Sequence, residues 1–112
     1  MNDPSLDAIF GSTSATRVLL FLENYGSAYA TRIARAFGMS VSRARAQLEK
    51  YEAAGLLVSR SVGRSRVFEW NPRSPRVPAL RAFLRALLES LPRDVIREFF
   101  RERQRPRRQG KR

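Results

Sequence analysis

The apolar residues of segment 33–56 recur every three to four positions, in two runs that Gly38 separates. They are Ile33, Ala34 and Phe37 in the first run and Val41, Ala44, Leu48 and Tyr51 in the second. This spacing places each run on one face of a helix, so we predict two short helices joined by a tight turn. Gly38 can end the first helix in a left-handed backbone conformation, Ser40 can cap the second, and Gly55 closes it.

The polar side chains of the second helix fall outside its apolar face. The early ones carry hydroxyl, guanidinium and amide groups, at Ser40, Ser42, Arg43, Arg45 and Gln47. Such groups at the N-terminal end of a recognition helix meet base edges in the major groove of DNA. The alternative is an ordinary solvated helix face in a bundle, because two short helices joined by a glycine are common.

Segment 1–30 predicts two further helices and a short extended stretch. Asp3 or Ser5 can cap a helical turn that Gly11 interrupts, and the hydroxyl residues 12–14 can cap a longer helix that stops at Gly26. This longer helix is apolar nearly all round, so it either lies at the centre of the domain or serves an additional contact surface. Residues 27–30 are expected to be extended.

After Gly55 the hydrophobic pattern changes to alternation. Residues 56–61 and 66–70 are rich in β-branched and aromatic side chains, and residues 62–65 between them include a glycine. This pattern predicts a β-hairpin. In the second run we expect Phe68 and Trp70 on the core face, and Val67 and Glu69 on the other.

The tip of the predicted hairpin is rich in arginine. Arg60, Arg64 and Arg66 lie at the tip and on its shoulders, a density that a hairpin does not need in order to fold. Directly after a helix-turn-helix, such a hairpin is expected to lie along the DNA backbone or in the minor groove. An arginine-rich surface loop without a function is the alternative.

The C-terminal part begins with a proline-rich linker at residues 72–78 and continues with a strongly apolar helix at residues 79–91. Its stripe consists of Leu80, Phe83, Leu84, Leu87, Leu88 and Leu91. The stripe is wide for so short a chain, so we expect a dimer interface, with completion of the core as the alternative. Pro92 breaks the helix, and Asp94 is expected to cap a last one that ends near residue 100.

Length and charge favour a small module that binds polyanions. With 112 residues one domain is expected, divided into a helix-turn-helix with its hairpin at 1–71, the linker at 72–78, C-terminal helices at 79–100 and a basic disordered tail at 101–112.

The formal charge is +12, from 22 basic and 10 acidic residues. Residues 1–40 carry three basic and three acidic groups, 41–66 six and two, 67–100 six and four, and 101–112 seven and one. A coding bias toward arginine would not explain why the first 40 residues are neutral, so we expect salt-dependent binding of nucleic acid.

Composition argues against most catalytic chemistry. The chain has no cysteine and no histidine, which removes thiolate and imidazole groups as metal ligands, redox centres and general bases. No base partners a nucleophile at a recognisable spacing, and no glycine-rich phosphate loop is present. We therefore expect no enzyme, no cofactor and no metal.

The N-terminus lacks the features of a signal peptide and no apolar run is long enough for a membrane span. Both observations favour a cytoplasmic protein, nucleoid-associated when DNA-bound.

The order of these elements resembles the winged-helix transcription regulators of the ArsR-like type. The resemblance covers about residues 6–91 and is carried by FGSTSATRVLLFL, TRIARAFGMSVSRARAQLEKYEAAGLL and LLVSRSVGRSRVFEWNP. The chain is also similar to the small winged-helix modules beside, or fused to, minimal nucleotidyltransferase domains. The fold class expected is mainly α with a small β-hairpin wing. Metal-sensing members of the ArsR-like type use Cys and His ligands, so their sensing function does not transfer to this chain.

The resemblance implies a homodimer that reads a palindromic double-stranded DNA. The side chains near the bases would be Ser40, Ser42, Arg43, Arg45 and Gln47. The side chains on phosphates and in the wing would be Thr31, Arg32, Lys50, Arg60, Arg64 and Arg66.

We therefore favour a sequence-specific transcriptional regulator, either a repressor or an autoregulator. The second hypothesis is a protein-interaction module, in which helix 79–91 docks a partner such as a nucleotidyltransferase. RNA binding or non-specific chromosome binding is a third.

Overall fold

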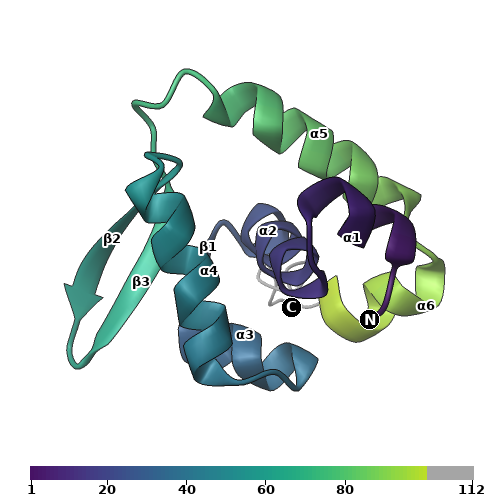
Figure 1. Ribbon diagram of the computed structural model, residues 1–112, viewed down its shortest axis with the longest axis horizontal. Coiled ribbons are helices and arrows are strands. Elements are labelled where there is room, and N and C mark those ends of the chain that lie inside the picture. Colours follow the sequence, from purple (N-terminus) through teal and green to yellow (C-terminus); the bar gives the residue numbers. More distant parts are fainter. Residues whose placement is uncertain (101–112) are drawn as a thin grey trace, which may run out of the picture.

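Six α-helices, a π-helical turn and three β-strands form within residues 1–100, the part of the chain that this computed structural model describes (Figure 1). The elements are α1 (Pro4–Phe10), α2 (Thr13–Tyr25), β1 (Ser27–Tyr29), α3 (Ala30–Phe37), α4 (Val41–Ala53), β2 (Leu57–Val62), β3 (Ser65–Trp70), α5 (Val77–Ser90), α6 (Arg93–Val95) and the π-helix η1 (Ile96–Phe100). The expected basic tail at 101–112 lies outside the described residues.

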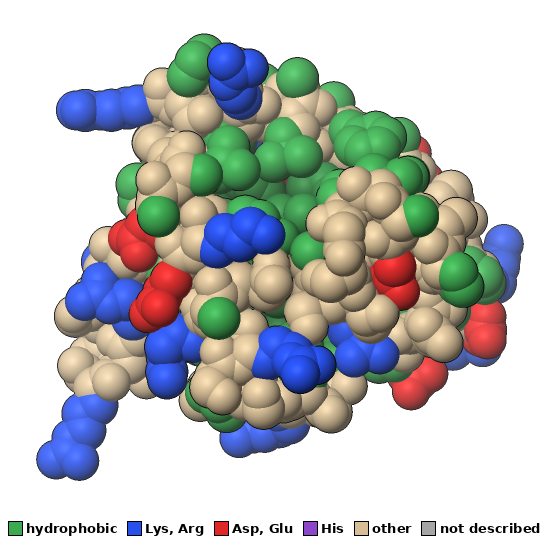
Figure 2. Space-filling view, viewed as in Figure 1, with side chains coloured by type: hydrophobic (Ala, Val, Ile, Leu, Met, Phe, Trp, Pro, Cys, Tyr) green, Lys and Arg blue, Asp and Glu red, His purple; other side chains and the backbone are tan. Residues whose placement is uncertain are grey.

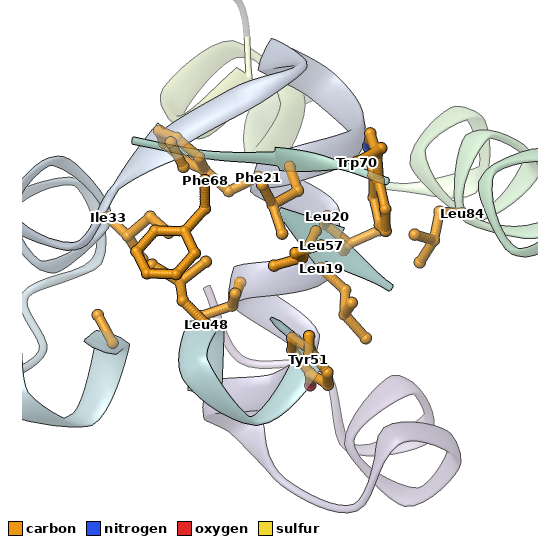
Figure 3. Close-up of a cluster of buried hydrophobic side chains, with 14 of the residues drawn as sticks. Leu19, Leu20, Phe21, Ile33, Leu48, Tyr51, Leu57, Phe68, Trp70 and Leu84 are labelled. Atoms are coloured by element: carbon orange, nitrogen blue, oxygen red, sulfur yellow. The ribbon is translucent and has the colours of Figure 1, made fainter. Parts of the chain in front are cut away.

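Helix α2 lies at the centre of the fold, as its nearly uniform apolar surface predicts. Its Val18, Leu20 and Leu22 are fully buried. Figure 3 shows side chains of α2 meeting Ile33 of α3, Leu48 of α4 and residues of the sheet in one cluster. Because α2 touches every layer, it fixes how the helix-turn-helix, the sheet and α5 lie relative to one another.

Local capping sets the helix boundaries much as the sequence predicts. The side chains of Asp3, Ser12 and Ser40 accept hydrogen bonds from backbone N–H groups in the first turns of α1, α2 and α4. Gly38 has a φ of +67° and ends α3, a conformation that a β-carbon would strain. The short turn between α3 and α4 is thus encoded by neighbouring residues.

The three strands form one antiparallel sheet in the order β1-β3-β2. Val62 pairs with Ser65, so the hairpin turns through Gly63 and Arg64 alone and is tighter than the four-residue connection expected from the sequence. Gly63 has a φ of +62°, as such two-residue turns require. Ala28 of β1 pairs with Phe68, so the extended segment predicted before α3 becomes the third strand.

Burial in β3 differs from the expected alternation. Phe68 and Trp70 are buried in the core, as predicted, but Val67 is buried as well, with 4% of its surface exposed. Val67 lies on the face opposite Phe68, as expected, but that face is covered at this position. β3 is the central strand, and Val67 has a register partner on each side, Tyr29 and Arg60, whose side chains project from the same face.

The C-terminal helices begin differently from the prediction. α5 starts at Val77, with Pro78 in its first turn, where a missing N–H costs nothing. The predicted linker is therefore shorter at its C-terminal end. The expected cap by Asp94 is also wrong: Pro92 occupies the N-cap position of α6, and Asp94 lies inside the first turn.

The apolar stripe of α5 is divided between the core and the surface. Leu84, Leu88 and Leu91 are buried within the chain itself. Leu80 and Leu87 are partly buried, and Phe83 is 45% exposed. Three of the six expected dimerisation residues thus complete the core, and the other three retain exposed surface.

Candidate nucleic-acid interface

Helix α4 presents most of its circumference to solvent. Its buried positions are Ala44, Leu48 and Tyr51, with Val41 half-buried, and these hold it against the core. The other residues of α4, and Ser40 before it, are exposed or half-buried, so all five predicted base-proximal side chains are accessible. The seam that the sequence predicts therefore leaves the opposite face of the helix available to a partner.

The exposed face of α4 has a small centre and two polar flanks. Helical geometry places Ser42 and Ala46 opposite the buried seam. Arg43, Gln47 and Lys50 lie on one flank, and Arg45, Glu49 and Glu52 lie on the flank that faces the hairpin. Small side chains at the centre allow the helix axis to approach a surface closely, while long side chains on both flanks reach past it.

The predicted base-proximal residues differ in how freely they can bind. The hydroxyl oxygen of Ser40 accepts the N–H of Arg43 at 3.1 Å, so this side chain caps the helix. Within the described part of the chain, the guanidinium groups of Arg43 and Arg45 form no salt bridge or hydrogen bond, and both residues are exposed. Gln47 accepts a hydrogen bond from the phenol of Tyr51 at 3.1 Å, which leaves its amide nitrogen free to donate.

The β2–β3 hairpin, residues 57–70, is hereafter called the wing, and its three arginines are held differently. The Nε of Arg60 pairs with Glu69 at 3.1 Å. A terminal nitrogen of Arg66 donates to the hydroxyl of Ser59 at 2.9 Å, and that hydroxyl donates to a carboxylate oxygen of Glu52 on α4 at 2.6 Å. Among the described residues, only Arg64 of these three has no side-chain partner, and it lies in the turn.

Side chains from α3, α4 and the wing meet around a crevice of about 260 Å³, hereafter called the basic crevice. It is lined by Thr31 of α3, Arg45 and Glu49 of α4, and Arg64 and Arg66 of the wing, among others. Four of these residues were predicted as DNA-binding from the sequence. Figure 2 shows Lys and Arg side chains gathered over this part of the molecule.

Sequence reasoning missed Glu49 as a member of the crevice. Its position four residues after Arg45 places both side chains on the same flank of α4, and that spacing was the available signal. A carboxylate here repels phosphate groups, but it can accept a hydrogen bond from the amino group of cytosine. The basic crevice therefore has the means for selectivity as well as for attraction.

Two other predicted phosphate-binding residues lie outside the crevice. The guanidinium of Arg32 lies over the rings of Phe21 and Tyr25, with centroid distances of 5.9 and 5.1 Å. Lys50 is exposed on the opposite flank of α4, with its Nζ 5.9 Å from the ring of Tyr51. Neither residue lines the crevice, so any phosphate that they bind is a different one.

The described residues contain no group of three or more acidic side chains arranged to hold a metal ion. Within the same residues, no helix has the length and apolar character required to cross a membrane.

Two solved structures share the arrangement of these elements. The crystal structure of AntR, an antimony-specific transcriptional repressor, superimposes with a TM-score of 0.57 at 21% identity, over 78% of this chain and 77% of AntR. A MarR-family transcriptional regulator from Rhodococcus sp. RHA1 gives a TM-score of 0.53 at 17% identity, over 83% of this chain and 72% of the regulator. The chain has a winged helix-turn-helix fold.

The predicted fold class is thereby confirmed, with α3 and α4 as the helix-turn-helix and β2 and β3 as the wing. Neither a protein-family model nor a curated protein matches the chain by sequence.

Proposed function

We propose that this chain is a transcriptional regulator that binds double-stranded DNA, with α4 in the major groove and the wing on the backbone or in the minor groove. The observation that carries the proposal is the basic crevice, where Arg45 of the recognition helix meets Arg64 and Arg66 of the wing. The net charge of +12 supports it, because a chain of this charge gains affinity for DNA by releasing counterions. Both structural neighbours carry the name of a transcriptional regulator.

The exposed face of α4 offers groups suited to base edges. Arg43 and Arg45 can each donate two hydrogen bonds to guanine, and Gln47 can pair with adenine. Ser40 and Ser42 supply hydroxyl groups at the helix N-terminus, where recognition helices meet the groove floor. Ala46 at the centre of the face can contact a thymine methyl group.

The wing supplies phosphate contacts of unequal strength. Arg64 binds a phosphate without losing an existing partner, whereas Arg60 and Arg66 would have to exchange Glu69 and Ser59 for it. We therefore assign the main backbone contact of the wing to Arg64, with Thr31 beside it in the basic crevice. Arg32 and Lys50 are candidates for other phosphates.

Among winged-helix regulators we propose the ArsR-like type, and the three sequence segments quoted above are what supports it. AntR is named as antimony-specific, but this chain has no thiolate or imidazole side chain with which to bind a metalloid. A repressor or autoregulator that responds to something other than a metalloid is consistent with this composition.

We also propose a homodimer that forms through an apolar surface patch on α1 and α5. The patch consists of Ile9, Phe10, Leu80, Phe83 and Leu87. Ile9 and Phe83 are 55% and 45% exposed, and the rings of Phe10 and Phe83 lie 6.2 Å apart, which joins the two helices. Figure 2 shows hydrophobic side chains gathered below α5 on this face. A dimer would pair two recognition helices on a palindrome.

Sedimentation of Phe83→Ser tests the dimer. We expect the variant to be monomeric, while Val62→Ser, which removes a similarly exposed side chain from the wing, stays dimeric. The same patch would instead dock a protein partner, such as a nucleotidyltransferase, if the unmodified chain is monomeric at all concentrations. Capture of that partner would then have to survive high salt and nuclease treatment.

Selection of bound sequences from random DNA, followed by titration of the winning site, tests DNA recognition. We expect Arg43→Gln and Arg45→Gln to lose about 1 to 3 kcal/mol on the selected site and to change the preferred sequence. Arg64→Gln should weaken selected and random DNA alike and lower the salt slope by about one.

Arg76→Gln is the matched control, because it removes the same charge from an exposed position before α5. If Arg43→Gln and Arg45→Gln behave like this control on every sequence, α4 is not the recognition helix. Equal binding of RNA and of random DNA would indicate non-specific nucleic-acid binding instead.

A further inference from the structure

A second pocket, of about 560 Å³, lies between α5, the segment after β3 and the C-terminal half of α2. Its lining includes Glu23 of α2, Trp70 at the end of β3, Pro72, and Val77 and Arg81 of α5. None of its lining residues belongs to the basic crevice. The volume falls in the range of pockets that take small molecules.

The polar side of this pocket has a net positive charge. Glu23 is only 4% exposed, and its two carboxylate oxygens accept hydrogen bonds from Nε of Arg81 at 2.8 Å and from a terminal nitrogen of Arg85 at 2.9 Å. Two guanidinium groups thus face one carboxylate, which leaves one positive charge in excess. Within residues 1–100 the terminal nitrogens of Arg81 make no hydrogen bond, and its side chain is 43% exposed. These donors are available to a second anion.

The apolar side of the pocket includes the indole of Trp70. Trp70 is 8% exposed, and its Nε1 makes no hydrogen bond within the described residues. The guanidinium of Arg81 lies over the same indole, 5.9 Å from its centroid. Because Nε1 has almost no accessible surface, a ligand in the pocket would meet the indole ring and not this nitrogen.

We propose that this pocket binds a small organic acid with a compact apolar body, and that the bound acid weakens the DNA binding proposed above. The carboxylate would bind the free nitrogens of Arg81 and Arg85, and the apolar body would pack on Trp70, Pro72 and Val77. A cationic ligand is disfavoured, because the charge of Glu23 is already offset and the two guanidinium groups repel a further cation. A neutral ligand would leave the excess charge of the pocket uncompensated.

The regulatory part rests on the proposed function and follows from where the pocket lies. Trp70 ends β3, the central strand of the sheet and one of the two strands of the wing. Arg81 belongs to α5, which carries part of the apolar patch. A ligand that contacts both Trp70 and Arg81 fixes the C-terminal end of β3 relative to α5. It also adds a negative charge to a basic chain, which lowers the attraction to DNA.

Binding is tested first without DNA, on the full chain. Trp70 is the only tryptophan, so its fluorescence reports this pocket alone. Benzoate should change the emission saturably, and benzamide, which matches it in shape but has no charge, should not. Arg81→Gln should weaken benzoate about tenfold or more, because a charge-assisted hydrogen bond is lost, while Arg76→Gln should leave it unchanged.

A second variant tests the pocket without breaking the Glu23–Arg81 ion pair, whose loss could unfold the chain. Ala82 lines the pocket and is exposed, so Ala82→Phe fills the pocket without removing any hydrogen bond. Ala82→Phe should abolish the benzoate response while its thermal unfolding midpoint stays near that of the unmodified chain. Absence of a saturable response in the unmodified chain would overturn the site, and equal responses to benzoate and benzamide would overturn the assignment of an acid.

The coupling to DNA is a separate titration at matched ionic strength. Saturating benzoate should weaken DNA binding about fivefold or more, as is typical of coupling between sites, and Ala82→Phe should not respond. Fluorescence binding without any effect on DNA affinity overturns the regulatory half of the proposal. No DNA binding at all, with or without benzoate, overturns the proposed function and leaves the site to be judged by fluorescence.

Discussion

The phenol of Tyr51 donates a hydrogen bond to Oε1 of Gln47, 3.1 Å away and one turn earlier on α4. Tyr51 is 8% exposed and belongs to the hydrophobic core, whereas Gln47 is half-buried at the edge of the exposed face. A core residue therefore fixes the orientation of an amide that we expect to face DNA. Held in this way, Gln47 presents its nitrogen outward as the donor.

Tyr51→Phe should reduce discrimination at the base pair that Gln47 contacts, with little loss of overall affinity. The substitution keeps the ring in the core and removes only the hydroxyl. The amide of Gln47 then loses an orienting hydrogen bond that contributes about 0.5 to 1.5 kcal/mol, and it can rotate. Titration of single-base variants of the selected DNA site measures the effect. Tyr25→Phe, which removes the bond to the carbonyl of Phe99, is the control. A uniform loss over all base pairs would show that Tyr51 supports the helix and does not orient Gln47.

The stability of the chain should fall with rising pH above 10. Burial raises the pKa of Tyr51 from 10.0 to about 12. Below pH 10 the phenol is protonated in both states and its contribution is complete. Above that value the unfolded chain ionises first, and the contribution is lost as pH rises through about 12, by up to about 2.7 kcal/mol. Urea unfolding of the chain and of Tyr51→Phe across this window checks it, since the difference between the two should depend on pH. A constant difference would contradict the prediction.

Short-range features of the fold were predictable from the sequence, because they depend on neighbouring residues. Ser12 and Ser40 cap the helices that follow them, and Gly38 ends α3, as the spacing of apolar and polar residues indicates. Burial of Val67 was not predictable in this way. It depends on β1 pairing with β3, and the strength of such a distant pairing leaves no periodic signal in either segment.

The candidate sites were predictable to different extents. The exposed face of α4 follows from helical periodicity, so the sequence alone places Arg43 and Arg45 outside the buried seam. The partners of Arg60 and Arg66 depend on hairpin register, which is fixed by the exact length of the turn. The pairing of Glu23 with Arg81 joins residues 58 positions apart, and no local pattern indicates it.

Glu23→Gln should destabilise the fold by about 1 to 3 kcal/mol. The substitution is nearly isosteric but leaves two guanidinium groups facing a neutral amide beside the core. The cost stays moderate because both arginine side chains are at least a third exposed and remain hydrated. Urea unfolding measures it, with Glu89→Gln on the exposed side of α5 as the control. Equal stability of the two variants would show that the Glu23 pair contributes little.

Glu49→Gln should strengthen binding to random DNA about two- to fivefold. Glu49 lines the basic crevice beside Arg45 and Arg64, where its charge opposes the approach of a phosphate. If Glu49 also accepts a hydrogen bond from a cytosine, the same change should lower the preference for the selected site over random DNA. Titration of both DNAs at two salt concentrations separates these effects, because only the electrostatic part is screened. Glu89→Gln makes the same change in net charge far from α4, so an equal gain in that variant would mean that the acidic group in the crevice has no local role.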